Sequence, residues 1–413
     1  METINKNPPL IMHVDLNSCF ATIKQQASPH LRGKPLVIAA YDSPAGCVLA
    51  PSIEAKKLGI KTGMTVREAK LLCKGVIVRT PDVALIRDAH RKFSKITKDY
   101  SPEVYPKSID EVVIDFRSMD RLNLDLIDIG KEIKQRFRGE IGEWVSCNVG
   151  IAPNRFLAKL AASLHKPDGL DIITHQNLIK VYDSVSLTDL HGINTRYQAR
   201  LNAQGIFTPL QFLETDSETL KRKVFQSIVG HHWYMRLRGY EIDDVEFKRK
   251  SFGQDFALGK KTDDPEELSR ILMKLCEKMG RRLRKSGYVA NGIHVGIIYE
   301  DGTYWHRGRK VHSSMYTTKE LFTKVMWVFN QQPQRKVVGK LMVSCYSLSS
   351  SAMSQPTLFD EENKGHRVSD AIDQINDRYG EYVVTPALMM GMNDLVIERI
   401  SFGATKGIED LYI

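Results

Sequence analysis

Residues 105–116, YPKSIDEVVIDF, decide the fold of the region around them. β-Branched and aromatic residues dominate from Ile109 to Phe116, and residues of this kind favour a β-strand. Two adjacent carboxylates, Asp110 and Glu111, stand where this strand begins. Neighbouring side chains of a regular strand point to opposite faces. We therefore expect a turn or an irregularity here that lets both carboxylates reach one site.

A third carboxylate, Asp15, interrupts a second apolar strand pattern, IMHVDLNSCF at residues 11–20. A buried carboxylate without a partner is costly or takes up a proton, and three of them together would repel one another. Divalent cations remove this conflict, because Mg²⁺ binds carboxylate oxygens and substrate phosphates. Two such ions about 4 Å apart hold the attacking and leaving oxygens of a phosphoryl transfer. The alternative, an ordinary strand-end carboxylate hydrogen-bonded to a loop, stays open for each group, and it is our interpretation of Asp115.

The chain has 413 residues, which is too long for one simple core, so we expect several domains. Strand and helix patterns alternate to about residue 173, short helices with glycine turns follow to residue 245, and strands with two helices fill 251–348. The sequence therefore predicts an α+β multidomain protein. It contains no apolar run long enough for a membrane span and no secretory signal. We expect a cytoplasmic location and no membrane partner.

The net charge of +10 is concentrated in one segment. Residues 248–348 carry 20 lysines and arginines against 9 acidic residues, whereas residues 349–413 carry 5 against 11. A basic module of this kind favours binding to a polyanion, and a solvated basic surface without a partner is the alternative. The local concentrations are RRLRKSG at 281–287 and HRGRKVH at 306–312. The candidate contacts to a polyanion are Arg281, Arg282, Arg284, Lys285, Arg307, Arg309 and Lys310.

Three blocks of sequence carry a family resemblance: HVDLNSCFA at 13–21, SIDE at 108–111 and GIAPNRFLAKLAASLHKPDG at 150–169. In this order and spacing they resemble the conserved blocks of Y-family translesion DNA polymerases, the group of bacterial DNA polymerase IV and the polymerase V catalytic subunit. The resemblance covers residues 10–245 well and the basic module more loosely. It implies a right-hand polymerase with a ferredoxin-like palm, small fingers, a helical thumb containing a helix-hairpin-helix, and an α+β little finger.

The resemblance also divides the chain into domains. The expected segments are the palm at 1–18 and 79–173, the fingers at 19–78, the thumb at 174–245, a linker at 246–250, the DNA-binding little finger at 251–348 and a tail at 349–413. We expect the tail to combine a flexible polar stretch at 349–365 with a terminal helix, HRVSDAIDQINDRYG, at 366–380.

The resemblance assigns roles to residues of the first two blocks. Asp15, Asp110 and Glu111 would hold two Mg²⁺ ions, for which Mn²⁺ can substitute, and the backbone carbonyl of Leu16 would be a further ligand. Phe20 stands at the steric-gate position, where a flat ring fills the space that a ribose 2′-hydroxyl group needs.

Other residues would bind the incoming dNTP. By resemblance, backbone N–H groups of Cys19 and Phe20 would meet its triphosphate, and Lys159 would supply a cation to it. Lys56 would add a second cation, as a point charge on a phosphate rather than a bidentate fork.

The block CVLAPSIEAKKLG, residues 47–59, departs from the polymerase IV pattern. Ala50, Ile53 and Lys56 stand where that pattern has Ser or Thr, Tyr and Arg. The block is closer to polymerase V, whereas Phe20 and the third conserved block are closer to polymerase IV. The subgroup therefore stays open.

Two further segments match the family in part. In the thumb, HGIN has Asn194 where a helix-hairpin-helix usually carries Gly, and we expect Asn194 to tolerate the left-handed conformation there. In the tail, QPTLFD at 355–360 resembles the peptide by which bacterial polymerases bind the sliding clamp. Gln355 would hydrogen-bond, and Leu358 and Phe359 would fill an apolar pocket. Taken alone, this hexapeptide is short enough to occur by chance.

One hypothesis accounts for all of these features: a template-directed DNA polymerase of the translesion type. It would add dNTPs to a primer 3′ end by two-metal-ion transfer, as a monomer, with low fidelity, lesion bypass during DNA damage tolerance and no proofreading exonuclease. Its partners would be primer–template DNA, dNTPs and a bacterial sliding clamp.

Two alternatives explain less. A nucleotide cyclase or another nucleotidyltransferase with a similar palm would not need the thumb, the basic module or the clamp-like peptide. A non-catalytic or partner-dependent DNA-binding, clamp-associated repair protein would show the loss of a metal ligand, and all three carboxylates are present.

Overall fold

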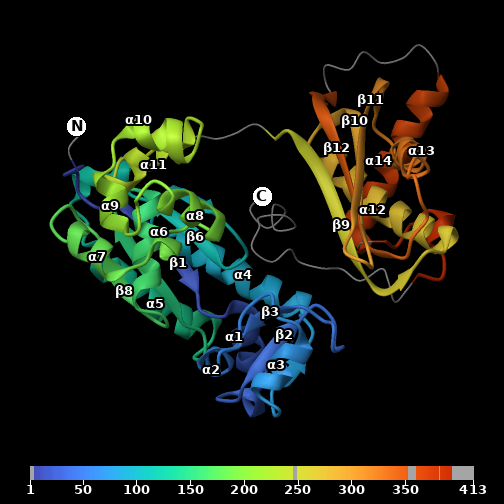
Figure 1. Cartoon of the computed structure of the whole chain (residues 1–413). Coiled ribbons are helices and arrows are strands. Elements are labelled where there is room, and N and C mark those ends of the chain that lie inside the picture. Colours follow the sequence, from blue (N-terminus) through green and yellow to red (C-terminus); the bar gives the residue numbers. More distant parts are fainter. Residues whose placement is uncertain (1–3, 245–248, 352–359, 381, 393–413) are drawn as a thin grey trace. The chain divides into compact units, whose positions relative to one another are not determined.

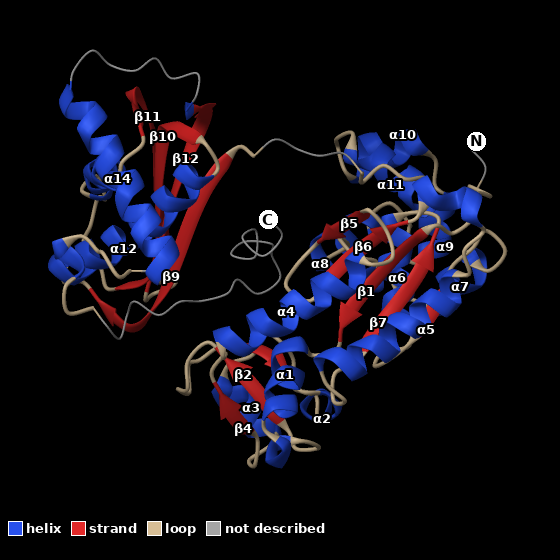
Figure 2. Cartoon of the chain, turned by 180° about the vertical axis from the view of Figure 1, so that it is seen from behind, coloured by secondary structure: helices blue, strands red, loops and turns tan. Residues whose placement is uncertain are grey.

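A computed structural model of the chain describes residues 4–244, 249–351, 360–380 and 382–392. The chain divides into two compact units, of which the first reaches Val245 and the second begins at Glu246. Figure 1 colours the chain from the N-terminus in blue to the C-terminus in red, and Figure 2 shows its helices and strands from behind. Among the described residues, no helix is both long and apolar enough to cross a membrane.

A five-stranded sheet with strand order β5-β6-β1-β7-β8 forms the centre of the first unit. Its strands are β1 (Ile11–Leu16), β5 (Glu103–Pro106), β6 (Glu111–Asp115), β7 (Cys147–Ala152) and β8 (Leu170–Ile172). Strand β1 lies in the middle and is antiparallel to both β6 and β7. The register pairs Asp15 with Glu111, so two of the predicted site residues are direct neighbours across the sheet.

Side chains alternate between the two faces of this sheet. One face carries Met12 and packs with α1 (Cys19–Ala27), α4 (Val83–Lys98) and α5 (Leu126–Arg136). The other face carries Ile11 and Val113 and packs with α6 (Arg155–Leu164). Asp15 and Glu111 follow the same alternation as Ile11 and Val113, so both carboxylates belong to the face that α6 covers.

Helix α6 approaches the sheet closely at Gly150 on β7. A Cβ atom at this position would lie 2.1 Å from the carbonyl oxygen of Ala158 and 2.2 Å from the amide nitrogen of Ala162. Any larger residue would therefore push the helix away from the strand. The small residues on both sides fix the height of α6 above the sheet, and with it the position of Lys159.

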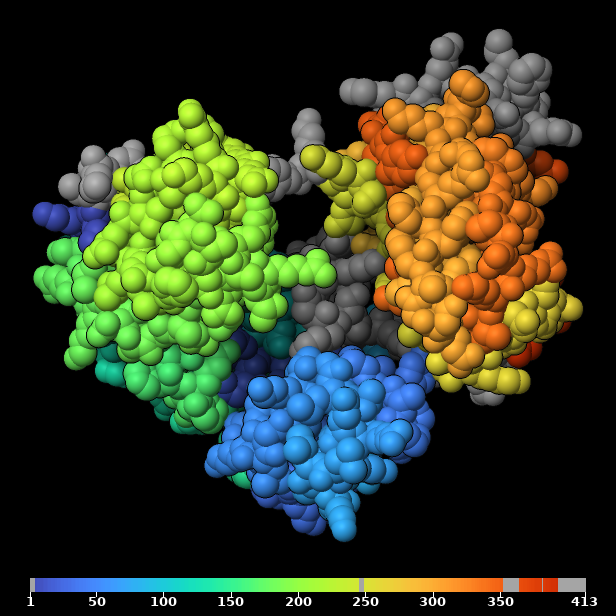
Figure 3. Space-filling view, viewed as in Figure 1, coloured from blue at the N-terminus to red at the C-terminus, as the bar shows by residue number. Residues whose placement is uncertain are grey.

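The segment between α1 and α4 forms a small lobe, seen in blue shades in Figure 3. Its three-stranded sheet has the order β3-β2-β4, with β2 (Leu36–Ala39), β3 (Val48–Pro51) and β4 (Ile77–Arg79). Its helices are α2 (Ile53–Lys57) and α3 (Val66–Leu72). The Ser52 side chain accepts a hydrogen bond from the amide of Ala55 and so starts α2, the helix that carries Lys56.

Short helices follow in the segment expected to be the thumb: α7 (Leu178–Ser184), α8 (Thr195–Asn202), α9 (Pro209–Glu214), α10 (Ser217–Thr219) and α11 (Val229–Leu237). The expected conformation of Asn194 is wrong. Asn194 has an extended backbone (φ −94°, ψ 176°), and its side chain accepts a hydrogen bond from the amide of Tyr197 as the N-cap of α8. Gly192, two residues earlier, is the residue with a positive φ (+100°).

The second unit contains a four-stranded antiparallel sheet with the order β11-β10-β12-β9. Its elements are β9 (Ser251–Thr262), α12 (Pro265–Lys285), β10 (Tyr288–Tyr299), β11 (Tyr304–Met315), α13 (Thr318–Phe329) and β12 (Val338–Ser350). Apolar side chains of α12 and α13 share one core with the sheet. This is the predicted α+β unit with two helices on a sheet.

The terminal helix α14 (Asp360–Tyr379) begins six residues before the predicted start at His366. Part of the stretch expected to be flexible, from Asp360 onward, is therefore helical. Helix α14 packs on the second unit through acidic residues: Asp373 pairs with Arg284 at 2.6 Å, and Asp370 accepts a hydrogen bond from the Tyr316 hydroxyl at 2.5 Å. The helix is thus part of this unit and not a separate tail.

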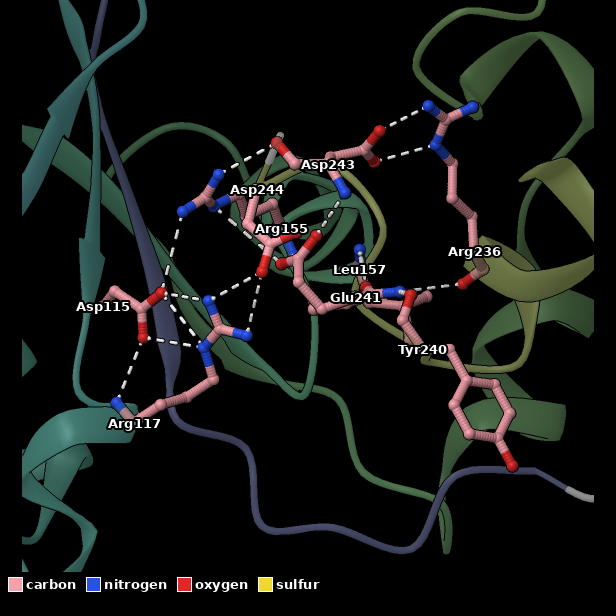
Figure 4. A network of polar contacts seen from close by, with 10 residues as sticks. Asp115, Arg117, Arg155, Leu157, Arg236, Tyr240, Glu241, Asp243 and Asp244 are labelled. Carbon is pink, nitrogen blue, oxygen red and sulfur yellow. Dashed lines mark hydrogen bonds and ion pairs between the residues drawn. The ribbon is translucent and has the colours of Figure 1, made fainter. Parts of the chain in front are cut away.

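A buried network of ion pairs holds the last described residues of the first unit to its central sheet (Figure 4). Asp115, at the end of β6, is fully buried and accepts hydrogen bonds from Arg117 at 2.7 and 3.0 Å. Arg117 also pairs with Asp244 at 3.3 Å. Arg155, the first residue of α6, lies 3.7 Å from Asp115, and its amide donates to the Glu241 carboxylate at 2.9 Å. Asp115 therefore has a structural role, as expected.

Candidate active site

The backbone brings the three predicted metal ligands together. The amide of Leu16 donates to the carbonyl oxygen of Asp110 at 2.9 Å, next to the pairing of Asp15 with Glu111. Asp110 belongs to a bend at residues 108–110, directly before β6 begins. The bend is the irregularity expected at this point, and it frees Asp110 from the alternation of the strand. That both carboxylates reach one site stays a prediction.

Asp15 and Asp110 line a cavity of about 170 Å³. The cavity lies where the central sheet meets the start of α1 and the lobe that carries α2. Its lining residues are Asp15, Leu16, Asn17, Ser18, Cys19, Ala50, Pro51, Lys56, Thr62, Asp110 and Lys166. Of the residues predicted from the sequence to bind metal or nucleotide, this set includes Leu16, Cys19 and Lys56 besides the two carboxylates.

Each carboxylate of the site has a polar partner. The Asp15 carboxylate pairs with the Lys166 ammonium group. Asp110 accepts a hydrogen bond from the Ser108 hydroxyl group at 2.5 Å. The Glu111 carboxylate pairs with the Lys159 ammonium group at 2.6 Å. Two of the three predicted metal ligands are thus held by lysines.

Burial and mutual repulsion set the protonation of these groups. Burial raises the pKa of Asp110 to about 6, against the hydrogen bond from Ser108, and the charges of Asp15 and Glu111 add to the rise. Burial also raises the pKa of Asp15, although Lys166 opposes this. For Glu111 burial acts in the same direction, but the nearby His13 ring and the ion pair with Lys159 outweigh it and hold the pKa below its ordinary value. The site is therefore rich in negative charge that needs compensation.

His13 lies beside this site and was not predicted. It is buried on β1, neither ring nitrogen has a hydrogen-bond partner, and Nε2 lies 3.7 Å from the Glu111 carboxylate. Burial lowers the pKa of His13 to about 3, so the ring is neutral. The only signal in the sequence was its position two residues before Asp15.

The donor chemistry of the site fits Mg²⁺. Asp15 and Asp110 line one cavity, and hard cations of this kind prefer oxygen ligands such as carboxylates. Across the described ranges, however, no group of three or more His, Cys, Asp or Glu side chains is arranged to hold a metal ion. The Glu111 side chain faces Lys159, and it does not line the cavity. The predicted set of metal ligands is present, but it is not assembled in this conformation.

The start of helix α1 is suited to an anionic group. Ser18, which precedes the helix, has a left-handed backbone (φ 49°, ψ 40°), and its buried hydroxyl group has no hydrogen-bond partner. The first amide groups of a helix have no acceptor within the helix, and a negative charge is favoured there. Ser18 and Cys19 therefore present a buried hydroxyl and a helix N-terminus to the cavity.

The steric-gate prediction for Phe20 stays a prediction. Phe20 follows Cys19 in the first turn of α1, but its side chain is only 2% exposed and does not line the cavity.

Lys159 pairs with Glu111 and does not line the cavity, so its contact with the triphosphate stays a prediction. Lys166, which sequence reasoning missed, lines the cavity with Lys56. Lys166 stands seven residues after Lys159 in the same conserved block, so the block itself was the available signal. Lys56 lines the cavity, and burial lowers its pKa. Its contact with a phosphate stays a prediction.

Two of the candidate DNA contacts on α12 are engaged with α14. The Arg284 side chain is 3% exposed and pairs with Asp373, so the predicted DNA contact of Arg284 is wrong. Arg281 pairs with Asp377. Arg282 lies with its guanidinium group 5.7 Å from the centre of the Phe252 ring, and Lys285 is exposed.

The candidates on β11 point to both faces of the sheet. By the alternation of the strand, Arg307 and Arg309 belong to the same face as Trp305 and Val311, which pack on the core shared with α12 and α13. Arg309 also donates to the Gln331 side chain at 3.3 Å. Lys310 is exposed and belongs to the opposite, helix-free face. The predicted clamp contacts of Gln355, Leu358 and Phe359 lie outside the described residues.

Comparison with known proteins agrees with this arrangement. Residues 14–163 match the family model of the impB/mucB/samB family, and residues 249–358 match that of its C-terminal domain. DNA polymerase IV of Pelotomaculum thermopropionicum is 31% identical over 94% of this chain and 97% of its own length. DNA polymerase IV of Moorella thermoacetica is 30% identical over 92% of this chain and 96% of its own.

Solved structures show the same fold at lower identity. A Y-family DNA polymerase chimera of Dbh and Dpo4 has a TM-score of 0.70 and 23% identity, covering 82% of this chain and 98% of its own. An insertion ternary complex of Dbh DNA polymerase has a TM-score of 0.59 at 23% identity, covering 81% and 98%.

A right-hand polymerase fold is defined by three features of the chain. They are the acidic strand ends of the central sheet, the helical segment that follows it in the sequence, and the separate four-stranded unit. The chain belongs to the impB/mucB/samB family and is a DNA-directed DNA polymerase of the Y-family, translesion class.

Proposed function

We propose that this polymerase adds dNTPs to a primer 3′ end with two Mg²⁺ ions held by Asp15, Asp110 and Glu111. The observation that carries the proposal is the cavity in which Asp15 and Asp110 meet the start of helix α1. Such a cavity offers oxygen ligands for a cation and helix amide groups for a phosphate in one place. Both are needed to bind a metal–nucleotide complex.

Bound Mg²⁺ would supply charge stabilisation to the attacking and leaving oxygens of the transfer. The residues of this chain would hold and orient the reactants. The unpartnered Ser18 hydroxyl, the start of α1 and the ammonium groups of Lys56 and Lys166 are placed to bind the triphosphate. Phe20 would exclude a ribose 2′-hydroxyl group from the sugar position.

The second unit would bind primer–template DNA through its phosphates. Phosphate contacts carry no sequence information, which suits a polymerase that must accept any template. Lys285, Arg307 and Lys310 are exposed and would contact these phosphates. Docking on a sliding clamp through Gln355, Leu358 and Phe359, a monomeric state and a cytoplasmic location complete the proposal.

Primer extension tests the proposal directly. The full-length chain should extend a primed DNA template with dNTPs in Mg²⁺, and a chelator of divalent cations should stop the reaction. Mn²⁺ should restore it. A chain that binds primer–template in a salt-dependent way but never extends it, even with a sliding clamp added, would favour the non-catalytic alternative.

Phe20→Val should weaken the discrimination between dNTPs and rNTPs by about 10²-fold, because the smaller side chain leaves room for a 2′-hydroxyl group. Single-nucleotide incorporation of dCTP and CTP opposite a template guanine measures this ratio. Phe93→Val is the matched control, since Phe93 is as buried as Phe20 but lies on α4, whereas Phe20 directly follows the cavity residue Cys19. An equal loss of discrimination in both variants would show a general loosening rather than a gate.

A further inference from the structure

The two lysines that hold Asp15 and Glu111 come from one short stretch of chain. Lys159 lies on α6 and Lys166 lies in the loop that follows it. The Lys159 and Lys166 side chains are 25% and 42% exposed, and the carboxylates that they hold are 22% and 15% exposed. The close packing of α6 on Gly150 fixes where this stretch begins.

The partners of the three carboxylates are not equivalent. Asp110 has the neutral Ser108 hydroxyl group, whereas Asp15 and Glu111 each have an ammonium group. A lysine in contact with a carboxylate does electrostatically what a cation does, because it offsets the repulsion among buried negative charges. It also occupies an oxygen atom that a metal ion would need.

We propose that Lys159 and Lys166 are internal counter-ions, each holding one carboxylate in the metal-free protein and releasing it when a divalent cation binds. The inference rests on the proposed metal site and adds to it. It explains why Glu111 does not line the cavity although its Cα atom is paired with that of Asp15.

This competition couples the binding of the metal ion to the binding of the nucleotide. A cation that binds alone must displace two lysines, and the displaced charges then repel it. A cation that arrives with a triphosphate brings negative charge of its own, and Lys166 already lines the cavity where that charge would sit. The metal ion alone should therefore bind weakly, and the metal ion and the dNTP should strengthen each other's binding.

Calorimetric titration of the full-length chain with Ca²⁺, without nucleotide or DNA, tests the proposal. Ca²⁺ is a suitable probe because it binds the same oxygen ligands as Mg²⁺. Lys159→Met and Lys166→Met should each tighten Ca²⁺ binding by about five- to tenfold, because a competing ion pair is removed. Lys159→Arg should keep the affinity of the wild type. A lysine that acts only by binding phosphate would leave the affinity for Ca²⁺ alone unchanged.

Lys56→Met is the charge-matched control. Lys56 lines the same cavity but makes no ion pair among the described residues, so its removal should tighten Ca²⁺ binding by no more than about twofold. An equal effect in all three Met variants, or none in the Lys159 and Lys166 variants, overturns the proposal. The two lysines also provide independent tests if one variant fails to fold.

Asp110→Ala separates this inference from the proposed function. If wild-type Ca²⁺ binding survives in Asp110→Ala, the metal site itself is wrong and the counter-ions have no role. If Asp110→Ala abolishes Ca²⁺ binding but neither lysine variant binds Ca²⁺ more tightly than the wild type, only the counter-ion proposal fails.

Discussion

Asp110→Ala should lower the rate of primer extension by about 10³-fold or more at saturating DNA and dNTP. Asp110 lines the cavity and is largely buried, so in the proposed metal site its carboxylate would be an oxygen ligand that no neighbouring group replaces. Losing one preorganised stabilising group in an active site typically costs about 10²- to 10³-fold, and a metal ligand should cost at least as much. Rapid-quench measurement of single-nucleotide incorporation gives the rate.

The same variant should bind primer–template with the affinity of the wild type within about twofold, because phosphate contacts elsewhere dominate that affinity. Asp128→Ala is the matched control. Asp128 is an exposed carboxylate of α5 whose ion pair with Lys131 lies on the surface, and its loss should leave the rate unchanged. Near-normal extension by Asp110→Ala would remove Asp110 from the proposed metal site.

Asp115→Ala should destabilise the first unit by about 3–5 kcal/mol. Asp115 is fully buried and accepts several hydrogen bonds from Arg117, with Arg155 nearby. Removing one partner of a buried ion pair leaves the other charges without compensation, and this costs more than the pair itself contributes. The free energy of unfolding of this unit alone can be read from hydrogen exchange in peptides of β1 and β6.

Two comparisons define what that result means. Asp128→Ala removes an exposed ion pair and should cost no more than about 1 kcal/mol. Peptides from β10 and β12 belong to the second unit, and their exchange should not change in Asp115→Ala. Equal destabilisation by Asp115→Ala and Asp128→Ala would show that the buried network contributes no more than a surface pair.

The position of the acidic site could be predicted from the sequence because it depends on local pattern. The apolar runs around Asp15 and Glu111 have the composition of strands, and both became neighbouring strands of one sheet. The conflict between strand alternation and two adjacent carboxylates predicted an irregularity, and the bend at Asp110 is that irregularity. Periodicity of two residues was sufficient for this step.

Contacts between distant segments could not be predicted in the same way. Arg284 belongs to a basic cluster in the sequence, but its partner Asp373 lies 89 residues further along the chain. Nothing in the sequence RRLRKSG distinguishes a buried arginine from an exposed one. Which of Lys159 and Lys166 lines the cavity likewise depends on how α6 packs on the sheet, and the close contact at Gly150 is part of that packing.

At Asn194 two rules for reading the sequence predict different conformations. Its place in a hairpin motif suggested a left-handed conformation, whereas its place directly before a helix suggested an N-cap. The structure follows the second rule, because the Asn194 side chain satisfies the amide of Tyr197 and Gly192 supplies the positive φ. Asparagine is among the preferred N-cap residues, so the signal for this outcome was in the sequence.

Helix α14 changes how the second unit should respond to ionic strength. Each DNA phosphate that a lysine or arginine neutralises releases condensed counterions and adds about −0.9 to the slope of log affinity against log salt concentration. Arg281 and Arg284 form ion pairs with Asp377 and Asp373 within the protein, so DNA phosphates do not neutralise these two charges. The slope should therefore be shallower by about 1.8 than the number of basic residues in this unit would suggest. The polymerase would therefore release fewer counterions when it binds its template, and its affinity for DNA would fall less as the salt concentration rises.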